Sequence, residues 1–168
     1  MINQKLLSKM LTKLGHSSAI ADNGLLGFEA IKKSYEPGER HFDLALVDVA
    51  MPVMDGREAT RAIRSWFAER SAGRSPNAPP ELAPLIVGLT AHALSTERDK
   101  CLEAGMNAVL TKPCSFATIA AQLHFWSQPG AAEAVAKGLV KPPASAGQSP
   151  ALSAAYTPNF SEQQRRLL

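Results

Sequence analysis

Hydrophobic residues recur along the first 126 positions in two alternating patterns, one helical and one strand-like. Five segments place apolar residues three or four positions apart, as on one face of a helix, and typical capping residues flank them. These predicted helices run from Asn3 to Gly15, onward from Asn23, over 56–70, from Ser95 to Gly105 and from Ser115 to position 126.

Four shorter apolar segments lie between these helices and have the length of buried strands. They cover residues 17–21, 42–49, 85–89 and 108–110. Strands that alternate with helices indicate a parallel sheet with helices on both faces. The pattern therefore predicts an α/β fold with a doubly wound parallel sheet.

The composition changes after position 126. In residues 127–168, Ala, Pro, Ser and Gly supply 22 of 42 positions, which leaves little bulky apolar surface to offset the entropy of ordering. We therefore expect one domain over 1–126 and a disordered tail over 127–168. The tail has 4 basic and 2 acidic residues, which is most of the net charge of +3. No helix-turn-helix fits in it, so no nucleic-acid partner is expected.

Several other classes of protein are excluded on simple grounds. No stretch approaches the roughly 20 apolar residues of a membrane span, and the amino terminus lacks a secretory signal. Cys101 and Cys114 have no metal-ligand spacing and fit a reducing compartment. We therefore expect a cytoplasmic protein with no membrane partner; the oligomeric state is left open.

Candidate chemistry lies where the strands end. Asp48, Thr90 and Lys112 each close one of three predicted strands, and the carboxyl ends of parallel strands meet at one edge, where ligands bind. A carboxylate can attack phosphorus, while an ammonium and a hydroxyl can bind phosphoryl oxygens. Two anions approach each other poorly without a cation, so Mg²⁺ is expected, with Asp48 among its ligands.

These residues stand in motifs that resemble a response-regulator receiver domain. The motifs are LVDVAMPVMDG at 46–56, LTAHA at 89–93 and LTKP at 110–113. The segments at 3–16 and 101–106 are most similar to the receivers of hybrid sensor histidine kinases. The resemblance extends over about 1–126 and implies a flavodoxin-like (βα)5 fold.

The resemblance also implies a role in a phosphorelay. Asp48 would accept a phosphoryl group from a histidine kinase or a histidine phosphotransfer protein, and Thr90 and Lys112 would contact the phosphoryl oxygens. The carbonyl of Ala50 would be a further metal ligand, and the Lys112-Pro113 peptide bond would be cis. The only enzymatic activity implied is self-catalysed phosphotransfer and dephosphorylation, so whether the chain is an enzyme stays open.

The chain departs from the receiver pattern at its start. A receiver begins with a buried strand that ends in two acidic residues holding Mg²⁺, and residues 1–3 match the start of the following helix. We therefore expect an amino-terminally truncated receiver that lacks the first strand and binds Mg²⁺ weakly. In the strand order 2-1-3-4-5, this loss would leave strands 17–21 and 44–47 facing each other across unpaired backbone groups.

Three functional classes follow. The first is a phosphoacceptor that switches a partner-binding face. The second is a degenerate receiver that binds a protein partner without phosphorylation, which the missing acidic pair supports. The third is a phosphotransferase or phosphatase of the haloacid dehalogenase type, which is disfavoured because that family has a second acid where this chain has Ala50.

Overall fold

The structure is a computed structural model that describes residues 4–75, 82–92, 94–143 and 166–167. The helices in this part of the chain are α1 (Gln4–Lys13), α2 (Gly24–Ser34), α3 (Gly56–Ala72), α4 (Ser95–Glu103), α5 (Phe116–Ser127) and α6 (Ala131–Ala136). The strands are β1 (Ser17–Ser18), β2 (Leu44–Asp48), β3 (Leu85–Thr90), β4 (Ala108–Thr111) and β5 (Arg166–Leu167). The predicted alternation of helices and strands through position 126 is confirmed.

Side-chain caps explain where several helices begin. The Asn23 side chain accepts a hydrogen bond from the amide of Leu26, and the Ser115 hydroxyl accepts one from the amide of Thr118. The prediction that Ser95 caps α4 is wrong. Leu94 holds the cap position without a side-chain bond, because Ser95 is already the first helical residue. The predicted cap at Asn3 lies outside the described residues.

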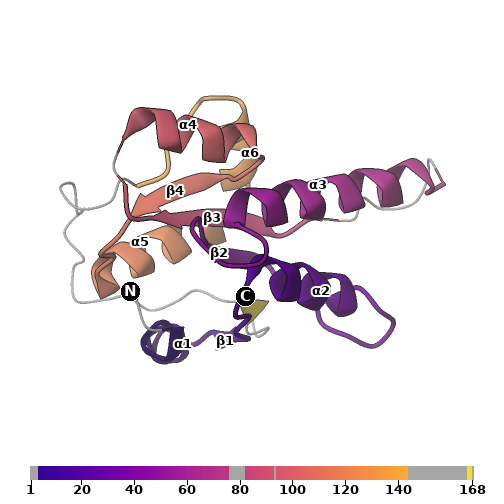
Figure 1. Ribbon diagram of the computed structural model, residues 1–168, viewed down its shortest axis with the longest axis horizontal. Coiled ribbons are helices and arrows are strands. Elements are labelled where there is room, and N and C mark those ends of the chain that lie inside the picture. Colours follow the sequence, from indigo (N-terminus) through magenta and orange to yellow (C-terminus); the bar gives the residue numbers. More distant parts are fainter. Residues whose placement is uncertain (1–3, 76–81, 93, 144–165, 168) are drawn as a thin grey trace.

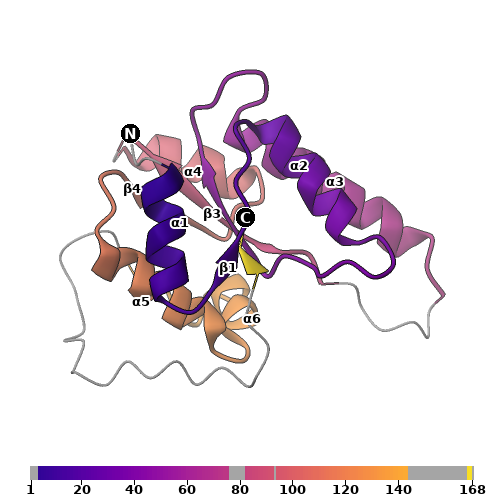
Figure 2. The same cartoon turned by 90° about the horizontal axis from the view of Figure 1, so that it is seen from below.

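All strands of the sheet are parallel, and helices cover both faces. The strand order is β1-β5-β2-β3-β4, with α1, α5 and α6 on one face and α2, α3 and α4 on the other (Figures 1 and 2). Each face has its own core. Leu44 belongs to the core under α1 and α5, whereas the next residue, Ala45, belongs to the core under α2 and α3. This alternation is what a strand buried on both faces requires.

The region between β1 and β2 differs from expectation. Instead of facing each other across unpaired backbone groups, these strands are joined by β5. Ser17 and Ser18 of β1 pair with Arg166 and Leu167, and Leu167 also pairs with Leu44 of β2. The C-terminal end of the chain therefore lies inside the sheet, where Figure 1 shows it as a yellow arrow beside β1.

Ordered structure also continues past the predicted domain boundary at 126. Helix α6 packs on α5, where Ala131 is 8% exposed and Val135 contacts the same core. The amide of the Gln122 side chain donates to the carbonyl of Pro143 at 2.5 Å, which fixes the chain after α6. Residues 144–165 and 168 of the predicted disordered tail, and 76–81 of the loop before β3, lie outside the described residues.

Candidate functional site

The carboxyl ends of β2 and β4 bring an acid and an amine into contact. The Lys112 Nζ atom lies 2.7 Å from Asp48 Oδ2, and the side chains are 18% and 35% exposed. Backbone bonds fix both ends against β3, because Val49 N donates to Leu89 O at 2.9 Å and Lys112 N donates to Thr90 O at 2.7 Å. The Asp48 carboxylate thus lies at an edge of the sheet that backbone hydrogen bonds hold together, is paired with a cation and is still reachable from solvent.

Thr90 lies at the same edge of the sheet in a more enclosed position. It is 3% exposed and pairs in register with Thr111, the residue before Lys112. Its Oγ1 atom accepts a hydrogen bond from the amide of His92 at 3.1 Å. The backbone of Thr90 therefore lies next to the strand that carries Lys112 of the Asp48–Lys112 pair. The Thr90 hydroxyl is hydrogen-bonded to the loop that follows β3. Ala93 of the LTAHA motif lies outside the described residues.

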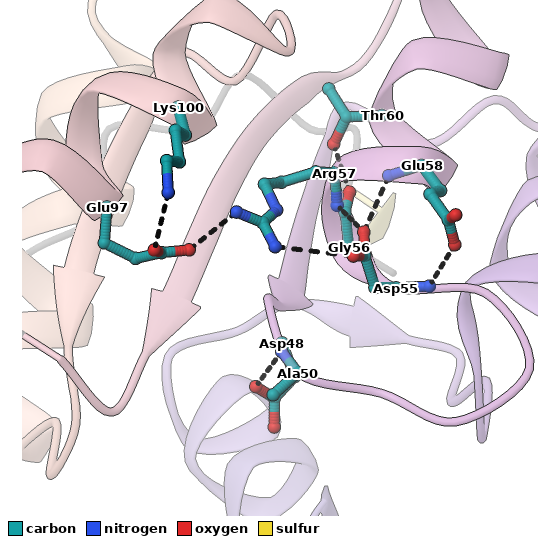
Figure 3. A network of polar contacts seen from close by, with 9 residues as sticks. All are labelled: Asp48, Ala50, Asp55, Gly56, Arg57, Glu58, Thr60, Glu97 and Lys100. Atoms are coloured by element: carbon teal, nitrogen blue, oxygen red, sulfur yellow. Dashed lines mark hydrogen bonds and ion pairs between the residues drawn. The ribbon is translucent and has the colours of Figure 1, made fainter.

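The oxygen donors beside Asp48 determine which metal ion fits. Ala50 follows two residues later, is exposed, and donates its amide to Asp48 Oδ1 at 3.2 Å (Figure 3). Within the described ranges, no group of three or more His, Cys, Asp or Glu side chains could hold a metal ion. Asp48 offers one carboxylate and Ala50 one main-chain carbonyl. These two ligands fit a Mg²⁺ ion only if water and phosphoryl oxygens fill its other coordination positions.

The start of α3 presses directly on the backbone of Asp48. A Cβ atom at Gly56 would clash with the Asp48 carbonyl oxygen and lie 3.0 Å from the Cγ1 atom of Val47. Asp55 and Glu58 form a capping box around this helix start, and the Thr60 hydroxyl donates to the Gly56 carbonyl at 2.7 Å (Figure 3). The sequence indicated the cap but not this close approach, which explains why only glycine fits here.

An ion pair links α3 to α4 beside the site. Arg57 Nη1 lies 2.7 Å from Glu97 Oε1, and Lys100 lies 3.9 Å from the other oxygen of Glu97 (Figure 3). Both members of the Arg57–Glu97 pair are about one quarter exposed, at 27% and 24%. Sequence reasoning missed this pair, because the two residues are 40 positions apart and belong to no common motif.

Two further features after β4 bear on the site. The Lys112-Pro113 peptide bond is cis, as the resemblance implied. Burial raises the pKa of the Cys114 thiol, and the nearby Lys112 ammonium offsets part of that rise. The thiol is therefore protonated near neutral pH and is an unreactive neighbour of the acid–amine pair.

A groove of about 540 Å³ leads from Asp48 and Lys112 into the molecule. Its walls come from both layers of helices. The lining residues include Leu7 and Leu11 of α1, Phe28 and Ile31 of α2, Ile63 of α3, and Leu46 and Val47 of β2. The groove therefore passes through the plane of the sheet beside β2.

Comparison with known proteins identifies the family. Residues 1–124 match the model of the response regulator receiver domain, so the chain belongs to that family. It is 37% identical over 125 residues to the sensor protein GacS of Pseudomonas syringae pv. syringae; the match covers 74% of this chain and 12% of GacS. The chain thus spans about an eighth of the length of that relative.

Two solved structures support the assignment. The receiver domain of the sensor histidine kinase PA1611 from Pseudomonas aeruginosa, with a magnesium ion in its active-site cleft, is 32% identical, with a TM-score of 0.55 over 74% of this chain and 88% of that one. A chain of the co-crystal structure of the Saccharomyces cerevisiae phosphotransfer protein Ypd1 and the Ssk1 receiver domain is 30% identical. Its TM-score is 0.63, over 74% of this chain and 81% of that one.

These matches confirm a flavodoxin-like receiver of two-component phosphorelay signalling. No helix in the described residues combines the length and apolar character needed to cross a membrane.

Proposed function

We propose that this receiver accepts a phosphoryl group on Asp48 from a phosphohistidine of a histidine kinase or a histidine phosphotransfer protein. The observation that carries the proposal is the 2.7 Å contact between Lys112 Nζ and Asp48 Oδ2 at the carboxyl edge of the sheet. A carboxylate that is one-third exposed and held by an ammonium is accessible to an incoming phosphoryl group, and the ammonium can neutralise charge that develops there.

In the proposed reaction, a carboxylate oxygen of Asp48 attacks phosphorus, a P–O bond forms, and the P–N bond to the donor imidazole breaks. The imidazole leaves with its electron pair and takes up a proton. The product is an acyl phosphate, and attack by water later releases inorganic phosphate and restores the carboxylate. Lys112 moves its hydrogen bond from the carboxylate to a phosphoryl oxygen, and Thr90 supplies a hydroxyl donor to another.

Asp48 and the carbonyl of Ala50 would hold Mg²⁺, which neutralises the charge of the phosphoryl oxygens when bound. A site with one protein carboxylate leaves most coordination to water, so we propose that Mg²⁺ binds weakly, with a dissociation constant in the millimolar range or above. The magnesium-bound receiver of PA1611 and the pairing of Ypd1 with Ssk1 support the proposed cation and the proposed class of partner.

The experiment is phosphorylation of the full chain by acetyl phosphate over a series of Mg²⁺ concentrations, followed by intact-mass measurement. We expect an added mass of one phosphoryl group in the unaltered chain and none in Asp48→Asn. Lys112→Met should slow labelling about 100-fold, because it removes a cation that stabilises the transferring group. Asp43→Asn is the matched control, because Asp43 immediately precedes the opposite end of β2 and is exposed.

A degenerate receiver that works without phosphorylation is the second candidate. The observation that favours it is the lack of a cluster of acidic side chains around Asp48 in the described part of the chain. No labelling at any Mg²⁺ concentration, in a chain that unfolds cooperatively, would favour this candidate and contradict the first.

A further inference from the structure

Three loops at the carboxyl edge of the sheet each present one exposed apolar side chain. Val53 lies between β2 and α3, Leu94 directly precedes α4, and Phe116 is the first residue of α5; their exposed fractions are 79%, 65% and 42%. Loops that follow parallel strands lie at the edge where those strands end, so the three side chains share an edge with Asp48. We call Val53, Leu94 and Phe116 the apolar rim.

Val53 differs from the other two residues of the rim because its backbone is strained. In the part of the chain that the structure describes, it is the only non-glycine residue with a positive φ, at 70°. The amide of Met54 donates to the carbonyl of Pro52 at 2.8 Å, so Val53 is the central residue of a γ-turn. A γ-turn with positive φ is rare and strained, and a β-branched residue is especially unfavourable there. Since the Val53 side chain is mostly exposed, its burial does not offset this cost.

Backbone contacts after the γ-turn hold it in place. The amide of Gly24 donates to the carbonyl of Met54 at 3.1 Å, and the amide of Asp55 donates into the capping box of α3 at 3.0 Å (Figure 3). A strained conformation persists where the surrounding structure determines it in this way, and such conformations cluster at functional sites. Here the fixed turn holds an apolar side chain out into solvent on the loop that follows Asp48.

We propose that the apolar rim is a docking surface for the apolar surface around the phosphohistidine of the protein that donates the phosphoryl group. This inference rests on the proposed function, because a phosphohistidine must come within bonding distance of Asp48, and the protein that carries it must then cover this edge of the sheet. Single exposed apolar residues are ordinary, whereas three at one edge, one of them held outward by a strained turn, are typical of an interface. A side chain that is already fixed loses little entropy on docking. A small phosphodonor needs no such surface.

Two phosphodonors separate docking from chemistry in the full chain. The protein donor is Ypd1 phosphorylated on its histidine, and the small donor is acetyl phosphate, both with Mg²⁺ in excess. Val53→Gly removes the side chain and accepts the positive φ, so we expect its Tm to stay within about 3 °C of that of the unaltered chain. The half-saturating concentration of phosphorylated Ypd1 should rise about 10-fold, because an interface contact is lost, whereas the labelling rate with acetyl phosphate should change by less than about 2-fold.

Two further variants are the controls. Val53→Ile keeps an apolar side chain in the turn and should keep the half-saturating Ypd1 concentration of the unaltered chain. Leu102→Ala removes an apolar side chain that is 38% exposed near the other end of α4, away from the rim, and should change neither measurement.

Four results would overturn the proposal. The first is no transfer from Ypd1 to a chain that acetyl phosphate labels, and the second is an equal half-saturating concentration for the unaltered chain and Val53→Gly. The third is slower labling by both donors or a larger fall in Tm in Val53→Gly, since Val53 would then support the loop itself. The fourth is a dimer that Val53→Gly dissociates, since the rim would then bind a second copy. If acetyl phosphate labels no chain, the proposed function itself fails, which is a separate outcome that also removes the basis of the docking surface.

Discussion

At the scale of single residues, Gly56 is the position where the choice of amino acid affects the geometry of the site most directly. Its missing side chain lets α3 begin directly against the backbone carbonyl of Asp48. Any Cβ atom there pushes the helix and the end of β2 apart. The position of the acid therefore depends on a residue with no chemistry of its own.

We expect Gly56→Ala to lower the free energy of unfolding by about 2 kcal/mol through overpacking, measured by urea denaturation. Gly73→Ala is the control, because the nearest atoms to a Cβ at Gly73 lie 3.9 Å away, which is ordinary contact. It should be neutral or slightly stabilising, since alanine reduces the entropy of the unfolded chain. A similar loss of stability in both variants would contradict this account.

At the scale of elements, Arg64 ties α3 to the segments that flank two strands. Its guanidinium donates to the carbonyls of Gly105 and Pro84 and, at 2.7 Å, to the side chain of Asn107. The same Asn107 oxygen accepts the amide of Ile86 in β3. Burial lowers the pKa of Arg64, but a guanidinium in a protein stays charged, so these are charge-assisted bonds.

We expect Arg64→Ala to lower the free energy of unfolding by about 2–3 kcal/mol, because it leaves partly buried acceptors unsatisfied. Arg61→Ala, one turn earlier on the exposed side of α3, should change it by less than about 0.5 kcal/mol. Urea denaturation of both variants measures the difference. Equal changes in the free energy of unfolding for the two variants would mean that Arg64 contributes to stability only through its helix propensity.

At the scale of the whole molecule, features repeated along the chain could be predicted from the sequence, whereas isolated contacts could not. Apolar spacing located five helices, and strand ends in a parallel sheet placed Asp48 and Lys112 at one edge, where they are in contact. The Arg57–Glu97 pair and the Arg64 bonds join residues between 20 and 43 positions apart, and an arginine that looks like a surface residue in the sequence gives no signal of its partner.

The C-terminal strand was missed for a different reason. The strand has two paired residues, Arg166 and Leu167, which are too few to show the alternating apolar pattern of a strand. They also follow a stretch whose composition predicts disorder. The short helix α6 was underestimated in the same way. Ala131 and Val135 give it only a narrow apolar face, and its packing on α5 decides that it is ordered.

The packing of α6 gives the last prediction. Ala131 is 8% exposed and belongs to the core that contains Trp126, whereas the adjacent Ala132 is exposed. Lysine at position 131 would bury an unpaired charge, so Ala131→Lys should undock α6 and lower the free energy of unfolding by about 2 kcal/mol.

Tryptophan emission distinguishes undocking from a local adjustment. In a Trp66→Phe background, the emission reports Trp126, which is 4% exposed and bonded to Gln122. We expect a red shift for Ala131→Lys and none for Ala132→Lys. If both variants keep the emission and stability of the background chain, α6 does not cover the core. If only Ala131→Lys shifts, the folded unit extends beyond residues 1–124, which match the family model, because a helix after the matched region shields the core tryptophan of α5.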